Sequence, residues 1–330
     1  PSGRRYYATA IGGHALGVFL NFAAVSLMAP LIQKGAQDSN GRVDMEMERR
    51  QLSALMRGFS WFVIWAPTSL AQAVLLMLCP EVDWPVLLVM GISTTILMIL
   101  LGRGLDRYEW RHAERKNGTN PPRTPRHSLA VVTLVCVSLI GSTVVLGQVA
   151  GYSIAQALML VAPAITLIWY VLQGRPFGKD SPVRRVLSFG RVLKEAAPSL
   201  LRTAVVLGLS GFIGRAAALV LPTREIALWL DLGSVSPWVF LAVLPILITI
   251  GGQVALSPIL LVVFFGELVR ELPVLPGDPT FIVYSLSVGW ALSMSASPIA
   301  TASLLISAIC RIAPRTLTWR WNGWYAVLCY

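Results

Sequence analysis

The chain has 330 residues, of which 55% are hydrophobic and only 13% are charged. A soluble domain carries about 25% charged residues, so this composition excludes an ordinary soluble fold and predicts an integral membrane protein. The net charge of +11 comes from clusters of Lys and Arg that lie between apolar stretches. That is the pattern of cytoplasmic loops and not of a nucleic-acid-binding surface, so the expected partner is the lipid bilayer and not nucleic acid.

The first apolar segment spans Tyr6–Ile32 and is interrupted by Gly12-Gly13-His14. Basic residues precede and follow it, so we expect a re-entrant hairpin that opens to the cytoplasm. The polar stretch Asp38–Arg57 is expected to form an amphipathic interfacial helix, with a solvated loop as the alternative. Phe59–Leu78 then crosses outward, and Pro85–Leu101 returns.

Two basic loops frame the middle of the chain. Residues 103–128 and 174–195 are rich in Lys and Arg, which assigns both loops to the cytoplasmic side. The two apolar spans between them, Leu129–Leu146 and Ser153–Leu172, make an even number of crossings, as two cytoplasmic ends require. The next span, Pro198–Pro222, leads outward to an acidic loop.

The last third of the chain follows the same order as the first. Apolar Pro237–Gly266 is interrupted by Gly251-Gly252-Gln253 and emerges in an acidic loop. It is expected to form a second re-entrant hairpin, with a single helix as the alternative. Thr280–Ile309, which contains Pro298, comes next, and an aromatic run begins at Trp319.

Small residues recur at matching positions in the two regions. Gly58 and Gly289 each precede a proline by nine residues, Pro67 and Pro298 respectively, and a cysteine stands twelve residues beyond each proline. Acidic residues follow the first cysteine and arginines follow the second, so the matching segments end on opposite sides of the membrane. This pattern predicts an inverted repeat, which is typical of secondary transporters with a substrate site near the midplane.

The predicted fold is an all-α polytopic membrane protein, an inverted repeat with two re-entrant hairpins and two broken transmembrane helices. Residues 1–102 form the hairpin, broken helix and closing helix of the first repeat. Residues 103–128 form the basic cytoplasmic loop. Residues 129–222 form the scaffold helices of the second repeat, and residues 223–330 form its hairpin, its broken helix and the start of its closing helix.

This order of elements resembles the ion transporter superfamily, which includes divalent anion/sodium symporters and arsenite-permease-like carriers. Each half there has three scaffold helices, a re-entrant hairpin, a helix broken at mid-membrane and a closing helix. The resemblance implies that scaffold helices of the first half precede Pro1, allows a homodimer, and points to the bacterial inner (cytoplasmic) membrane. The Ser-Asn-Thr signatures of its dicarboxylate branch are absent, and Ala66-Pro67-Thr68-Ser69 and Ser295-Ala296-Ser297-Pro298 stand in comparable places.

Uncharged hydrogen-bonding side chains surround the predicted helix breaks. The breaks are expected at Gly12, Gly13, Pro67, Gly251, Gly252 and Pro298, because proline lacks the N–H that bonds one turn back and glycine relaxes the backbone. Half-helix N-termini at such breaks direct a positive dipole end toward anionic groups. The predicted substrate- and ion-binding residues are Thr68, Ser69, Gln72, Ser295, Ser297, Thr301, His14, Asn21, Gln253 and Ser257.

His14 is the one histidine within an apolar segment. Its unperturbed pKa of about 6.5 makes it a candidate proton carrier. The alternative is a hydrogen-bonded structural histidine near the cytoplasmic surface, because Gln253, at the matching position of the other hairpin, cannot titrate.

These features predict secondary active transport of a small, anionic solute by alternating access, coupled to H+ or Na+. No enzymatic activity, resident metal or other cofactor is predicted, because an intramembrane enzyme needs a nucleophile–base pair or metal ligands at depth. Two alternatives remain open. One is a non-transporting scaffold subunit of a larger complex, and the other is an exporter or antiporter of the same fold.

Overall fold

The computed structural model describes residues 2–37, 41–111, 126–152, 154–173, 182–222, 225, 235–254, 256–270, 272 and 275–330. These residues are helical apart from their connections and contain no strand, only an isolated β-bridge between Gln37 and Val43. The predicted all-α class is therefore confirmed. The chain divides into two compact units, one of Pro1–Arg123 with Gly214–Tyr330 and one of Thr124–Ile213.

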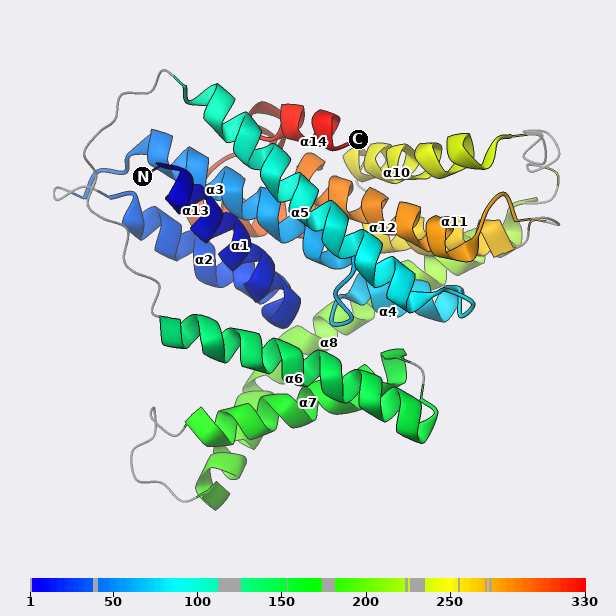
Figure 1. Cartoon of the computed structure of the whole chain (residues 1–330), viewed down its shortest axis with the longest axis horizontal. Coiled ribbons are helices and arrows are strands. Elements are labelled where there is room, and N and C mark those ends of the chain that lie inside the picture. The colour runs from blue at the N-terminus through cyan, green and yellow to red at the C-terminus, as the bar shows by residue number, and fades with distance from the viewer. Residues whose placement is uncertain are drawn as a thin grey trace. The chain divides into compact units, whose positions relative to one another are not determined.

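The smaller unit holds α6 (Arg126–Ala150), α7 (Ile154–Gln173) and most of α8 (Pro182–Val220), and α6 packs against α7 (Figure 1). α8 passes through Pro198 without ending, so the helix begins well before the predicted span Pro198–Pro222. Part of the predicted basic loop 174–195 is therefore helical. Residues 112–125 of the other predicted loop lie outside the described residues.

The larger unit begins with six helical segments, several of which start at a side chain that accepts backbone N–H groups. Asp44, Ser69 and Asp83 act as such caps, and Asp278 does the same in the second part of the unit. The six segments are α1 (Ser2–Leu20), α2 (Phe22–Gly35), α3 (Met45–Phe59), the 3-10 helix η1 (Ser60–Ile64), α4 (Leu70–Leu78) and α5 (Trp84–Glu109).

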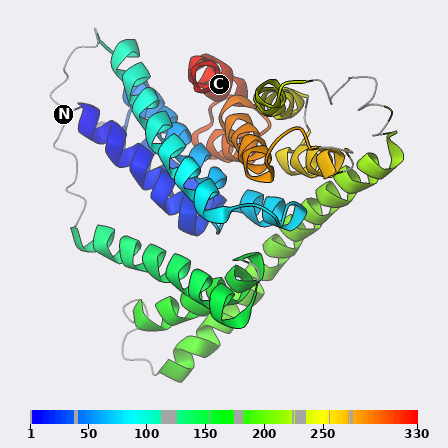
Figure 2. The same ribbon diagram turned by 45° about the vertical axis from the view of Figure 1, so that its right-hand side comes forward.

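The described residues of the second part, from 235 onward, also form six helical segments. They are α10 (Pro237–Gln253), α11 (Pro258–Arg270), α12 (Pro279–Ala296), α13 (Thr301–Cys310), the π-helical turn η2 (Thr316–Arg320) and α14 (Gly323–Cys329). Figure 2 shows the first part in blue to cyan and the second part in yellow to red.

The turn of the first hairpin lies at Asn21 and not at the predicted glycines. α1 runs through Gly12 and Gly13 without interruption, and Asn21, with a φ of 51°, separates it from α2. A Cβ on Gly13 would lie only 2.6 Å from Leu55 Cδ1, so this glycine gives α3 room to pack and does not break the helix. In the second hairpin, α10 ends at Gln253, directly after Gly251 and Gly252.

Two glycines lie at corresponding close helix crossings. α1 packs along α3, and α10 packs along α12. A Cβ on Gly58 would collide with the carbonyl oxygen of Ala10, and one on Gly289 would lie 2.9 Å from Pro245 Cα. In each crossing the first helix of a hairpin, α1 or α10, therefore lies directly on the backbone of the helix that follows the hairpin, α3 or α12.

The helices that follow Pro67 and Pro298, α4 and α13, pack differently. α4 packs against α11, where Gly266 lies against Leu78, and α13 packs against α2, where Cys310 Sγ lies 3.9 Å from the carbonyl oxygen of Ala29. Between them α12 packs on η1. α4 and α13 thus each contact the hairpin from the opposite part of the unit (Figures 1 and 2).

The buried face of α5 mixes apolar Leu87 and Ile99 with small or polar residues, whereas its exposed face carries many large apolar residues. Gly91, Thr95 and Asp106 are buried, whereas Val89 and Ile96 are 65% and 56% exposed. Within the described chain, α5 and the segment Pro279–Cys310, which comprises α12 and α13, are long and apolar enough to cross a bilayer, with mean hydropathies of 2.2 and 1.5. Both observations are compatible with membrane association.

Gly58→Ala tests the close crossing of α1 and α3. The added methyl group meets the carbonyl of Ala10, so α1 must shift, and overpacking of this kind costs about 1–3 kcal/mol. The matched control is Gly104→Ala on α5, where nothing lies within 4 Å of the new Cβ and helix propensity favours alanine by about 0.8–1 kcal/mol. Thermal melting in detergent should fall for the first variant and not for the second; a stable Gly58→Ala protein would contradict the crossing.

Candidate functional site

The first interruption lies between η1 and α4 and contains Pro67. Because proline has no N–H, the carbonyl of Val63 loses its helical partner. Ser69 Oγ and Gln72 Nε2 donate to this carbonyl oxygen instead, at 3.2 and 3.0 Å. Ser69 Oγ also accepts the N–H of Gln72 at 3.1 Å. Two of the predicted site residues thus replace the hydrogen bond that Pro67 removes.

The second interruption lies between α12 and α13 and contains Pro298. Ser297 Oγ accepts the N–H of Ile299 at 3.2 Å and donates to the carbonyl of Gly252 at 2.5 Å. At the first interruption Thr68 Oγ1 donates to the carbonyl of Val18. Thr68 therefore bonds a carbonyl near the end of α1, and Ser297 bonds one near the end of α10. In both cases the partner is the first helix of the hairpin in the same part of the unit.

Several buried polar atoms near the breaks have no partner among the described residues. They are Gln72 Oε1, Ser293 Oγ and Ser303 Oγ. Gln72 Nε2 reaches across to Ser287 Oγ on α12 at 3.0 Å, which joins the two interrupted helices. A buried polar atom left without a hydrogen bond costs about 1–3 kcal/mol, so these three oxygens are the positions where water or a small ligand is favoured.

The remaining predicted residues occupy less central places. Ser295 Oγ donates to the carbonyl of Leu292 in its own helix at 3.0 Å, and Thr301 is exposed at the start of α13. Gln253 Oε1 accepts the indole N–H of Trp319 at 3.0 Å. Asn21 and Ser257 lie half-buried in the turns of the two hairpins.

Both ring nitrogens of His14 are engaged next to the first interruption. Nδ1 lies 3.1 Å from the carbonyl oxygen of Gly58, and Nε2 lies 3.2 Å from the indole nitrogen of Trp65. A carbonyl only accepts and an indole N–H only donates, so the hydrogen-bond network assigns the proton to Nδ1 and leaves Nε2 as the acceptor. His14 is neutral in this arrangement.

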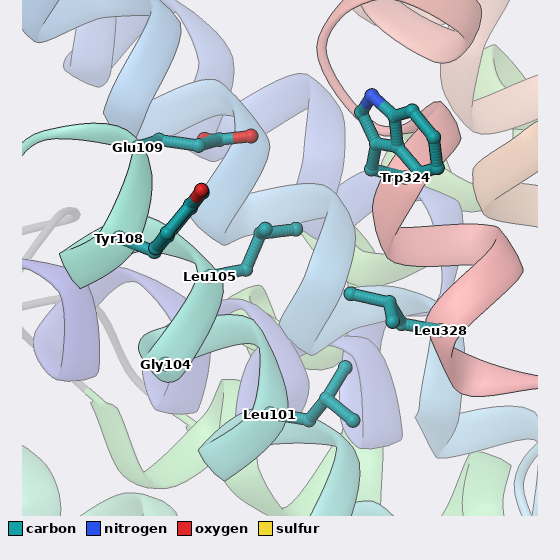
Figure 3. A pocket seen from close by; sticks show the side chains of 7 residues that line it. All are labelled: Leu101, Gly104, Leu105, Tyr108, Glu109, Trp324 and Leu328. Carbon is teal, nitrogen blue, oxygen red and sulfur yellow. The ribbon is translucent and has the colours of Figure 1, made fainter.

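Two pockets stand out in the larger unit, and neither lies at the Pro298 break. One is apolar and is lined by His14, Trp65 and residues of α1 and α5. The other is a groove in which Leu105 and Tyr108 of α5 face Trp324 and Leu328 of α14 (Figure 3). Most polar side chains at the breaks are instead packed away from solvent, with Gln72 and Ser293 fully buried.

Arg57 lies at the centre of a buried polar network that the sequence reading missed. Its side chain is 1% exposed; Nε donates to Asn322 Oδ1 at 2.9 Å, Nη2 lies 3.6 Å from a carboxylate oxygen of Glu109, and the guanidinium lies over the ring of Tyr325. Arg57 stands at the end of the polar stretch Asp38–Arg57, so its burial was not predicted. The available signal is that no other charged residue occurs in positions 51–80.

Comparisons of the chain with protein-family models, curated proteins and solved structures found no match. The resemblance to the ion transporter superfamily therefore stays an expectation that rests on the order of the elements. The site must be interpreted from its own residues.

Arg57→Met tests the buried network. The substitution leaves Asn322 Oδ1 and Glu109 without the guanidinium, and breaking a buried ion pair by removing one partner costs about 3–5 kcal/mol. Arg107→Met, at an exposed position of α5, is the control and should stay within about 0.5 kcal/mol of the wild type. Equal melting temperatures for the two variants would show that the Arg57 network contributes nothing to stability.

Proposed function

We propose that this chain is a membrane-embedded carrier that moves a small solute by alternating access. The observation that carries the proposal is the exchanged packing of hairpins and interrupted helices. α1 rests on α3 and α10 on α12, whereas α4 and α13 pack on the hairpin of the opposite part. An approximate two-fold relation between two repeats produces this exchange, so the packing supports the inverted repeat that secondary carriers use.

The apolar exposed face of α5 supports a bilayer as the solvent of the larger unit. Contiguous apolar surface of this kind is rare on soluble monomers. Its exposed residues include Val86, Val89, Ile92, Ile96, Leu97 and Leu100. In the proposed topology the chain is polytopic, with the apolar helices α6, α7 and α10 as further membrane segments.

The chemistry at the breaks favours a small anion or a neutral oxygen-rich solute. Ser69 caps the N-terminus of α4, and α13 begins directly after the second break, so two half-helix N-termini lie beside the breaks. The side chains of the two breaks are uncharged hydroxyls and an amide, with Gln72 and Ser293 offering unpartnered oxygens. We propose H+ or Na+ as the coupling ion.

A second candidate is a non-transporting membrane scaffold. The observation that favours it is the tight packing of both breaks, where Ser69, Gln72 and Ser297 are at most 2% exposed. A carrier in a closed state has the same appearance, so ligand binding distinguishes the two functions.

Ligand binding can be tested with detergent-purified protein. Melting is followed against inorganic and organic anions, with and without Na+; a ligand at 100 times its dissociation constant stabilises the folded protein by about 2.7 kcal/mol. Ser293→Ala should lose this stabilisation and melt no lower than the wild type without ligand, because Ser293 Oγ has no partner to lose.

The matched control for this experiment is Ser285→Ala on the same helix. Ser285 Oγ donates to the carbonyl of Leu241, so this variant should melt lower without ligand and keep the ligand-dependent stabilisation. If folded wild-type protein responds to no anion and no Na+, and proteoliposomes show no anion uptake, the scaffold function replaces the carrier function.

A further inference from the structure

We infer that His14 is the binding site of the coupling proton, and that a proton added to Nε2 releases Trp65 from the first helix break. The inference rests on the proposed carrier function for its link to transport. The hydrogen-bond switch between the two side chains stands on geometry alone and can be tested separately.

Protonation of His14 is incompatible with its present contact to Trp65. In the neutral imidazole, Nε2 accepts the indole N–H at 3.2 Å. A proton taken up from water makes Nε2 a donor, and the indole nitrogen has no acceptor capacity. Two N–H groups would then face each other, so the contact between Nε2 and Trp65 must break. The bond from Nδ1 to the carbonyl of Gly58 remains available, because Nδ1 stays a donor.

Trp65 connects this switch to the interruption itself. It directly follows η1 and stands two residues before Pro67. Its backbone is held against α5, because a Cβ on Gly91 would lie 2.6 Å from Trp65 Cβ. Its indole ring, which stacks near His14 with ring centroids 5.7 Å apart, is therefore the part that can move. Thr68, which bonds the carbonyl of Val18, lies three residues after Trp65. Movement of the Trp65 ring removes packing from this segment and so loosens it.

Among the residues that the structure describes, those lining the His14 pocket supply no charge to compensate an imidazolium. Tyr7 is the one titratable side chain that shares its pocket, and α5 contributes residues such as Ile92, Thr95 and Ile99. α3 offers only the carbonyl of Gly58. The neighbouring Arg57 directs its guanidinium to Asn322 and Glu109. α2 places the uncharged Met28 against this stretch of α1.

A cation in such a pocket is disfavoured unless water or an anion reaches it. Proton uptake is therefore favoured in a state in which the break has opened to water. Proton release is favoured in the closed state. This is the dependence that coupling between a proton and a conformational change requires.

The first experiment is NMR of the full chain in detergent, with isotope-labelled histidine and tryptophan. Three histidines are present, His14, His112 and His127, so His14→Gln and Trp65→Phe assign the two resonances. At about pH 8 we expect the Nδ1–H tautomer for His14, and as the pH is lowered from about 6.5 into the acid range the Trp65 indole resonance should shift together with the His14 titration. His127→Gln is the control and should leave both signals unchanged.

An Nε2–H tautomer, or a Trp65 signal that stays constant while His14 titrates, overturns the inference. The second measurement is anion uptake into proteoliposomes at a series of pH values. Glutamine can still donate to Gly58 and accept from Trp65 but cannot titrate, so His14→Gln should lose the pH dependence of uptake and keep its ligand-induced melting shift. Coupled NMR signals without uptake by the wild type would retain the switch and reject the carrier.

Discussion

The missing side chain at Gly58 is the constraint on which the larger unit depends. Because nothing separates its Cα from the carbonyl of Ala10, α1 lies on the backbone of α3. This contact sets the register in which His14 reaches the carbonyl of Gly58 and Thr68 reaches that of Val18. Gly289 has the same role for α10 and α12. A backbone contact of this kind fixes position more firmly than a contact between flexible side chains.

The parts of the fold that sequence reading predicted are those with a local cause. Pro67 and Pro298 remove a hydrogen bond whatever surrounds them, so interruptions were expected where η1 and α12 end. Gly12 and Gly13 misled, because a glycine within a helix signals a close neighbour as well as a turn. Arg57 was missed because its burial depends on Asn322, which lies far away in the sequence and has no local signal.

The two interruptions show how a buried chain break is kept satisfied. Hydroxyls and one amide take over the hydrogen bonds that the helix loses, and they also connect each break to a hairpin. The few oxygens left over, such as Gln72 Oε1 and Ser293 Oγ, stand out because almost all buried polar atoms in proteins are paired. At His14, a neutral ring satisfies two neighbours at once. Its protonation state therefore depends on the conformation around it.

The apolar outer face of α5 has a consequence for protein engineering. Its inward side combines apolar Leu87 and Ile99 with polar Thr95 and Asp106, a mixture that the interior of a water-soluble protein also accepts. In the proposed membrane location the outward layer is the part of the helix that contacts hydrocarbon, and its residues Val89, Ile96 and Leu97 are more than half exposed. Replacing that layer with glutamine and lysine is therefore the route to a form that keeps its interior and dissolves without detergent.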